Sequence, residues 1–117
     1  MNPRTLWTLT VPMRRSAQRS DGALAPDATR AVEARLLAKF GGYTAVTVTG
    51  AWINCATDEV ETDDSTRFEV ATDWQIHPNA YDTMYALAAA TCKRLAQDCV
   101  MLTRQDHRGY AVEYVEG

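Results

Sequence analysis

Residues 66–103 read TRFEVATDWQIHPNAYDTMYALAAATCKRLAQDCVMLT, and they contain three consecutive elements. Apolar and polar residues alternate over 66–72, which predicts a strand with Phe68 and Val70 on its inner face and Arg67 and Glu69 on the other. Apolar residues then recur every three to four positions over 79–95, which predicts an amphipathic helix. Residues 99–103 are again apolar and predict the next strand.

The same reasoning extends to both sides of this stretch. It predicts strands at 7–12, 44–53 and 110–115, a helix at 27–40 and an acidic connection over 54–65. This order is that of a ferredoxin-like α+β sandwich, βαββαβ, with an added C-terminal hairpin strand, in a single domain over 1–117. Both helices would cover one face of an antiparallel sheet. The other face would meet solvent or another subunit, and a closed ring of subunits would complete its burial.

Composition argues against several classes of function. The chain has 12 Lys and Arg against 15 Asp and Glu, a net charge of −3, so we expect no nucleic-acid partner. It has no apolar run of about eighteen residues, so we expect no membrane-spanning helix. Its three cysteines form no C-x-x-C pair and, with the two histidines, lack metal-ligand spacing. We therefore expect no metal, no cofactor and a reduced, cytoplasmic setting.

Acidic residues are concentrated in the middle of the chain. Residues 41–82 hold eight acidic residues and one basic residue, and five of the acids crowd one stretch: Asp58, Glu59, Glu61, Asp63 and Asp64. Trp52 precedes this stretch, with Phe40 and Tyr43 earlier. Aromatic rings and carboxylates with few basic residues can form a pocket for an organic cation. A solvated loop and a packed core would contain the same residues, so composition leaves these alternatives open.

Several short motifs occur in a fixed order along the chain. Arg14-Arg15-Ser16 follows the first strand, and Thr49-Gly50-Ala51-Trp52 lies in the next one. Further on come Ala88-Ala89-Ala90-Thr91-Cys92, Gln97-Asp98-Cys99-Val100-Met101-Leu102, and His107 and Gly109 before the last strand. This ordered set resembles the phage S-adenosylmethionine-cleaving enzymes, a family long called hydrolases and now described as lyases.

The resemblance implies a fold, an assembly and a reaction. It implies a ferredoxin-like subunit in a homotrimer, with active sites between subunits and S-adenosylmethionine as the substrate. In the lyase reaction the carboxylate of the substrate attacks its own γ-carbon, giving 5′-methylthioadenosine and homoserine lactone. Depletion of the methyl donor in the host cytoplasm would then act against restriction systems. The alternative is a non-enzymatic phage interaction protein, or a nucleotide-sequestering protein, on the same fold.

The resemblance also suggests which residues act. The family has paired acids before the third strand, and these correspond to Asp63 and Asp64 when the preceding variable loop is gapped. Glu69 is the alternative working carboxylate. Asp98 would contact ribose hydroxyls or the ammonium group of the substrate. The pocket for adenosine or sulfonium would be lined by aromatic residues: Trp52, Tyr43 and Phe40. The coliphage member of the family has tyrosine where Trp52 stands.

Overall fold

The computed structural model describes residues 4–12, 25–97 and 99–117, except for the side chains of residues 25, 26 and 52. Its elements follow in this order: β1 (Arg4–Pro12), α1 (Ala25–Phe40), β2 (Thr44–Asn54), β3 (Glu59–Asp73), α2 (Ala80–Leu95), β4 (Val100–Asp106) and β5 (Gly109–Val115). In the described part of the chain, neither helix is long and apolar enough to cross a bilayer.

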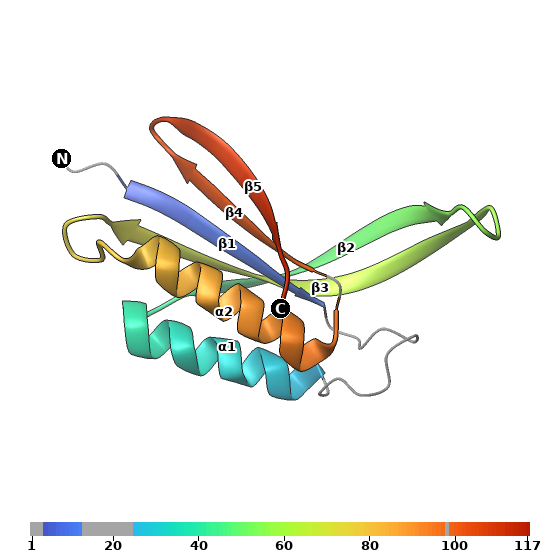
Figure 1. The fold of residues 1–117 in the computed structure, drawn as a ribbon, viewed down its shortest axis with the longest axis horizontal. Coiled ribbons are helices and arrows are strands. Elements are labelled where there is room, and N and C mark those ends of the chain that lie inside the picture. Colours follow the sequence, from blue (N-terminus) through green and yellow to red (C-terminus); the bar gives the residue numbers. More distant parts are fainter. Residues whose placement is uncertain (1–3, 13–24, 98) are drawn as a thin grey trace.

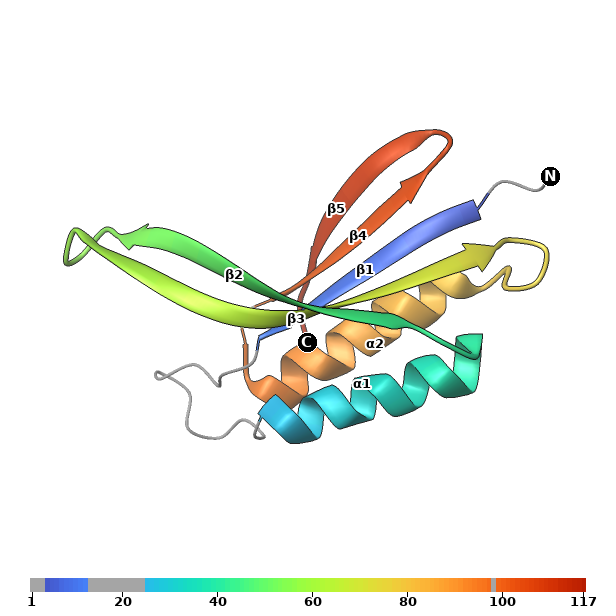
Figure 2. The same ribbon diagram turned by 180° about the vertical axis from the view of Figure 1, so that it is seen from behind.

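The five strands form one antiparallel sheet in the order β2-β3-β1-β4-β5. Both helices lie against the same face of this sheet (Figures 1 and 2). The strand order β2-β3-β1-β4 and the two crossover helices are those of a ferredoxin-like sandwich, and β5 extends the sheet at the β4 edge. The predicted fold class is therefore confirmed, including the added hairpin strand.

The core lies between the sheet and the two helices. Alternate residues of the central strands point to it, because successive side chains of a strand face opposite sides. Its members are at most 5% exposed: Trp7, Leu9, Val11, Ala28, Val32, Leu36, Phe68, Val70, Ala80, Met84, Ala88, Cys92, Leu95, Val100, Leu102 and Val115. The core thus includes the apolar positions predicted for residues 66–103, notably Phe68, Val70 and Met84.

The other face of the sheet is covered by no helix, and we call it the open face. The strand register assigns to it Leu6, Thr8, Thr10, Thr44, Val46, Arg67, Glu69, Met101, Thr103, Tyr110, Val112 and Tyr114. Threonines and Glu69 share this face, as predicted from the alternation over 66–72. Thr8 and Thr103 are hydrogen-bonded through their hydroxyls. Several apolar open-face side chains are exposed to solvent, among them Tyr110 and Tyr114.

The prediction of an acidic connection over 54–65 is wrong for most of that range, which is strand. The strand β3 begins at Glu59, so only residues 55–58 form the turn between β2 and β3. Asp58 in this turn has a φ of +58°, the left-handed conformation that aspartate tolerates better than most residues. The long β2–β3 hairpin extends past both helices, which gives the molecule its 51 Å long axis (Figure 1).

Candidate functional site

The acids predicted to act on the substrate lie on the β2–β3 hairpin. In the strand register Asp63 is opposite Gly50 and Asp64 is opposite Thr49. The Thr49 hydroxyl donates to Asp64 Oδ1 at 2.8 Å, so one carboxylate oxygen is fixed and the other stays available. Because neighbouring residues of a strand face opposite sides, Asp63 lies on the open-face side and Asp64 on the helix side. The paired acids therefore do not converge on one ligand within one chain.

Glu69 lies farther along β3 on the open face. It lines a shallow cavity of about 280 Å³ together with Leu6, Thr8, Arg67, Met101, Thr103, Gln105 and Tyr110. Arg67 Nη2 lies 3.7 Å from Glu69 Oε1, and the two side chains are 41% and 26% exposed. This ion pair offsets the negative charge of Glu69, so a cationic ligand would meet a weaker field there than at an unpaired carboxylate.

Tyr43 directly precedes β2 and Phe40 ends α1, whereas the acid pair lies opposite the middle of β2. The Tyr43 hydroxyl donates to Glu33 Oε2 at 2.6 Å, which raises the pKa of Tyr43 above its ordinary value. Its ring packs edge-on against Phe68, with 5.5 Å between ring centroids. Phe40 packs in the same way against His77, at 5.1 Å. Both rings thus have packing partners within the chain.

The aromatic residues and the acid pair are separated along the hairpin. Tyr43 directly precedes β2, and Thr49, the partner of Asp64, lies six residues further along the chain. Six residues of a strand span about 20 Å, so this is the distance along β2 between Tyr43 and the acid pair. One chain therefore does not bring Tyr43 and the acid pair around one small ligand. The backbone of Trp52 lies in β2 opposite Glu61, but its side chain lies outside what the structure describes. Asp98, like 14–16, lies outside the described residues.

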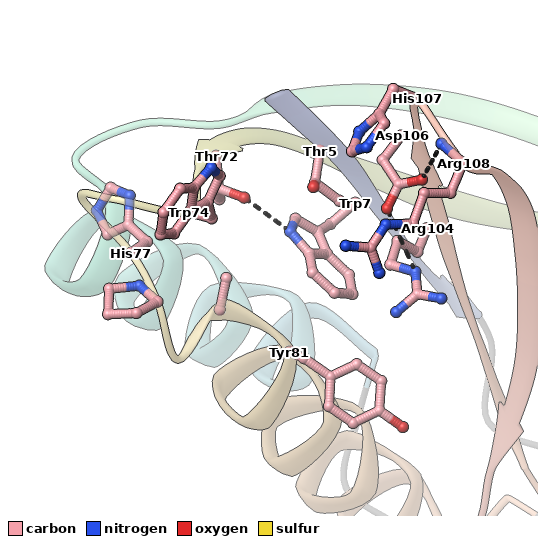
Figure 3. Close-up of a pocket in the computed structure, with 12 residues that line it drawn as sticks. Thr5, Trp7, Thr72, Trp74, His77, Tyr81, Arg104, Asp106, His107 and Arg108 are labelled. Carbon is pink, nitrogen blue, oxygen red and sulfur yellow. Dashed lines mark hydrogen bonds and ion pairs between the residues drawn. The ribbon is translucent and has the colours of Figure 1, made fainter. Parts of the chain in front are cut away.

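A cavity of about 530 Å³ opens on the helix side of the sheet (Figure 3). The end of β3 and the start of α2, which contribute to its lining, lie away from the β2–β3 turn (Figure 1). The cavity is lined by Thr5, Trp7, Thr72, Trp74, His77, Pro78, Ala80, Tyr81, Arg104, Asp106, His107 and Arg108, and we call it the aromatic cavity. The sequence interpretation missed this cavity, because its residues come from three stretches that lie far apart in the sequence: 5–7, 72–81 and 104–108. One local signal was available in the sequence: Trp74 stands in a polar stretch just after the predicted strand, where a large aromatic side chain is unusual. In the structure Trp74 is 59% exposed.

The described residues contain no group of three His, Cys, Asp or Glu side chains placed to hold a metal ion. The three cysteines are free thiols, with Cys92 buried and both Cys55 and Cys99 exposed. A thiol at Cys92 donates to the backbone oxygen of Gln97 at 3.1 Å, and its burial fits a packing residue.

Comparison with known proteins places these features in context. The sequence model of the S-Adenosylmethionine lyase family matches residues 14–117. No curated protein matches the sequence.

Two solved phage structures have a similar fold. A phage SAM lyase in the apo state superposes with a TM-score of 0.69 at 12% identity, covering 98% of this chain and 90% of that one. A phage SAM lyase in complex with S-methyl-5′-thioadenosine gives 0.67 at 10% identity, covering 99% and 91%. The divalent ion tolerance protein CutA1 from Ehrlichia chaffeensis gives 0.50 at 11% identity, covering 100% and 83%. At these identities the likeness concerns the fold alone.

Proposed function

Since the chain belongs to the S-adenosylmethionine lyase family, we propose that it cleaves S-adenosylmethionine to 5′-methylthioadenosine and homoserine lactone. The observation that carries this proposal is that the sequence model of the family matches residues 14–117 of the chain. The fold shared with two phage SAM lyase structures supports it, because one of those structures holds S-methyl-5′-thioadenosine, the nucleoside product of such a cleavage.

The chemistry asks little of the protein beyond orientation. A carboxylate oxygen of the substrate forms a bond to its own γ-carbon while the bond from that carbon to sulfur breaks and its electron pair stays on sulfur. The carboxylate and the sulfonium lose their charges together, the ammonium keeps its proton, and no proton is transferred. A pocket that holds the methionine arm bent and excludes water favours this transition state over the charged ground state. Orientation alone can contribute roughly 7–11 kcal/mol in ideal cases.

In this proposal the hairpin acids hold the cationic end of the substrate. Asp64 is the first candidate, because the Thr49 hydroxyl orients one of its carboxylate oxygens and leaves the other for the ammonium or sulfonium group. Asp63 is the alternative on the other side of β3, and Glu69, paired with Arg67, is the third. Asp98 would contact the ribose hydroxyls or the ammonium group. Trp52, Tyr43 and Phe40 would line the adenosine pocket, with cation–π contacts to the sulfonium.

A complete pocket in this proposal requires more than one chain, and we propose a homotrimer with sites between subunits. The separation of about 20 Å between Tyr43 and the acid pair supports this, because residues that far apart in one chain can meet across a subunit boundary. The strand β2 supports it too, since most of its described side chains are exposed and edge strands of this length are usually covered. The open face offers Val46, Val112, Tyr110 and Tyr114 as exposed apolar contacts.

Incubation of purified protein with S-adenosylmethionine, followed by chromatography, tests the reaction. We expect 5′-methylthioadenosine to accumulate with homoserine lactone or its hydrolysis product. A nucleotide-sequestering protein would instead bind the methyl donor and return it unchanged, and a purely structural oligomer would not bind it. In a host cell, expression of the active protein should lower the pool of the methyl donor, as an anti-restriction function requires.

Variants of the acids test the site. The double variant Asp63→Asn/Asp64→Asn should lower turnover at least about 100-fold, a loss typical of removing a group that holds developing or vanishing charge. Glu69→Gln tests the alternative carboxylate in the same assay. Glu59→Gln, an exposed acid of the same hairpin, is the matched control and should keep full activity. Full turnover in all of these variants would refute the site assignment even if the activity itself is real.

A further inference from the structure

The aromatic cavity has no part in the proposed lyase chemistry, and it lies at the opposite end of the sheet from the hairpin acids. Its volume of about 530 Å³ is within the range of small-molecule pockets, which span roughly 300–1,000 Å³. It opens on the helix side, so association through the open face would leave it accessible.

Three aromatic rings form one wall of the cavity (Figure 3). Trp7 lies deepest and is 4% exposed, and its Nε1 donates to Thr72 Oγ1 at 2.9 Å. The ring of Tyr81 is 6.0 Å from that of Trp7, at an interplanar angle of 54°. Trp74 is 59% exposed and Tyr81 is 38% exposed, so both rings present apolar surface to a ligand. Such a wall favours a planar aromatic ring, which can stack on one face and meet the edge of another.

The opposite wall is cationic and comes from the β4–β5 hairpin (Figure 3). Arg104 and Arg108 line it with Asp106, two positive charges against one negative. The Asp106 carboxylate accepts from the backbone N–H of Arg108 at 2.8 Å and lies 4.0 Å from Arg104 Nε. Among the described residues the guanidinium of Arg108 has no hydrogen-bond or ion-pair partner, so it is free to bind an anion.

The amino end of α2 adds to this positive field. The helix begins at Ala80, which lines the cavity, and its N-cap residue Asn79 makes no side-chain capping hydrogen bond. Amide groups of a first helical turn and the helix dipole both favour a negative charge nearby. Two carboxylates oppose this field from outside the cavity lining: Asp82 in the first turn of α2, and Glu113, which accepts the Tyr81 hydroxyl at 2.9 and 3.0 Å. The charged side chains that do line the cavity, Arg104, Arg108 and Asp106, keep it net positive.

We propose that the aromatic cavity binds a planar aromatic anion of the purine nucleoside monophosphate class. The base stacks against Trp74 and Tyr81 over the edge of Trp7, and the phosphate pairs with Arg108 and Arg104. The substrate of the lyase reaction does not suit this cavity, because its ammonium and sulfonium outweigh its one carboxylate and arginines would repel it. The opposite charge of the two ligands rests on the proposed lyase function, whereas binding of an anion in the aromatic cavity does not.

Isothermal titration calorimetry with adenosine 5′-monophosphate tests the proposal on the full-length protein. We expect saturable binding with one site per chain, and binding of neutral adenosine at least about fivefold weaker. Trp74→Ala and Arg108→Ala should each weaken binding of the monophosphate at least about fivefold, the range measured for loss of one stacking ring or one charged contact. Arg30→Ala is the matched control, because Arg30 is an exposed arginine on α1 paired only with Asp27 among the described residues.

Several results would overturn this assignment. Absence of saturable binding at millimolar monophosphate would do so, as would affinity within twofold of the wild type in both cavity variants. Equal affinity for adenosine would remove the anionic part of the proposal. Loss of monophosphate binding in Asp63→Asn/Asp64→Asn would place the ligand at the lyase site instead. Far-UV circular dichroism of each variant checks the fold, and lyase turnover in Trp74→Ala and Arg108→Ala should equal that of the wild type.

Discussion

The hydrogen bond between Trp7 and Thr72 joins two strands at the base of the aromatic cavity, and its removal should cost measurable stability. The two residues are 65 positions apart in the chain, the bond is buried, and the side chains are 4% and 3% exposed. In Trp7→Phe the Thr72 hydroxyl loses its partner, and an unpaired buried polar group costs about 1–3 kcal/mol. A ring smaller by roughly 40 Å³ adds about 1 kcal/mol at 24 cal/mol per Å³ of residual cavity.

The free energy of unfolding of Trp7→Phe should therefore fall by about 2–4 kcal/mol. Thr72→Val leaves the indole N–H unpaired and should cost about 1–3 kcal/mol. In the double variant both partners are gone, and replacement of both ends of a hydrogen bond by apolar groups costs less than the separate losses. We expect the double variant to be at least about 1 kcal/mol more stable than the sum of the single effects predicts.

Urea unfolding followed by far-UV circular dichroism measures these values, since tryptophan fluorescence changes when Trp7 is removed. All proteins should be compared at one chain concentration, because stability depends on concentration when chains associate. Additive losses within about 0.3–0.5 kcal/mol would show that the two groups do not interact and would refute the reasoning. If the free energy of unfolding of Trp7→Phe falls by less than about 1 kcal/mol, water reaches the Thr72 hydroxyl in that variant.

Two further predictions concern the ends of the sheet and its open face. The hydrogen bond to Glu33 raises the pKa of Tyr43 above its ordinary value. The stability that this bond gives the folded protein is therefore fully present below about pH 10, the ordinary tyrosine pKa, and is lost as pH rises through the higher pKa of the folded state. Tyr43→Phe should thus lower the unfolding midpoint at pH 7, with a difference from wild type that shrinks at strongly alkaline pH in thermal scans; a constant difference would contradict this. Tyr114→Glu, on the open face, should shift the proposed trimer to monomer in sedimentation velocity and lower lyase turnover at least tenfold. Leu37→Glu, on the exposed side of α1, should change neither. An intact, active trimer of Tyr114→Glu would exclude the open face as the interface.

The alternation of residues predicted the fold because most strands here have one buried and one open face. Phe68 and Val70 are buried and Glu69 is not, as a half-buried strand requires. The first half of β3 escaped prediction because Asp and Glu are rare in strands and crowd this segment. There the hairpin with β2 decides the conformation: Thr49 and Asn54 donate side-chain hydrogen bonds to Asp64 and Glu61 across it. Such cross-strand pairs are not visible in the local sequence pattern.

The candidate site was harder to predict than the fold. Proximity in sequence suggested that Tyr43, Trp52 and the acid pair share one pocket. The extended hairpin instead places Tyr43 about 20 Å along the strand from the acid pair, a distance that a compact loop would shorten. The aromatic cavity has the converse property. It joins Trp7, Tyr81 and Arg108, which no local motif connects, and only the tertiary arrangement of β1, α2 and the β4–β5 hairpin brings them to one place.

The structure also bears on which of the three carboxylates acts. If a second copy covers the open face, Glu69 and Arg67 lose water together, and a buried charge is tolerated only when its partner stays in place. Arg67 Nε is buried without a hydrogen-bond partner in the described part of the chain, so covering this face would leave Glu69 as the one ion-pair partner that the described residues offer Arg67. No ion pair engages Asp63 or Asp64 among the described residues, and the charge of each is therefore available to a cationic substrate. By this argument Glu69→Gln should weaken the proposed assembly before it affects the chemical step, whereas variants of Asp63 and Asp64 should lower turnover and leave assembly intact.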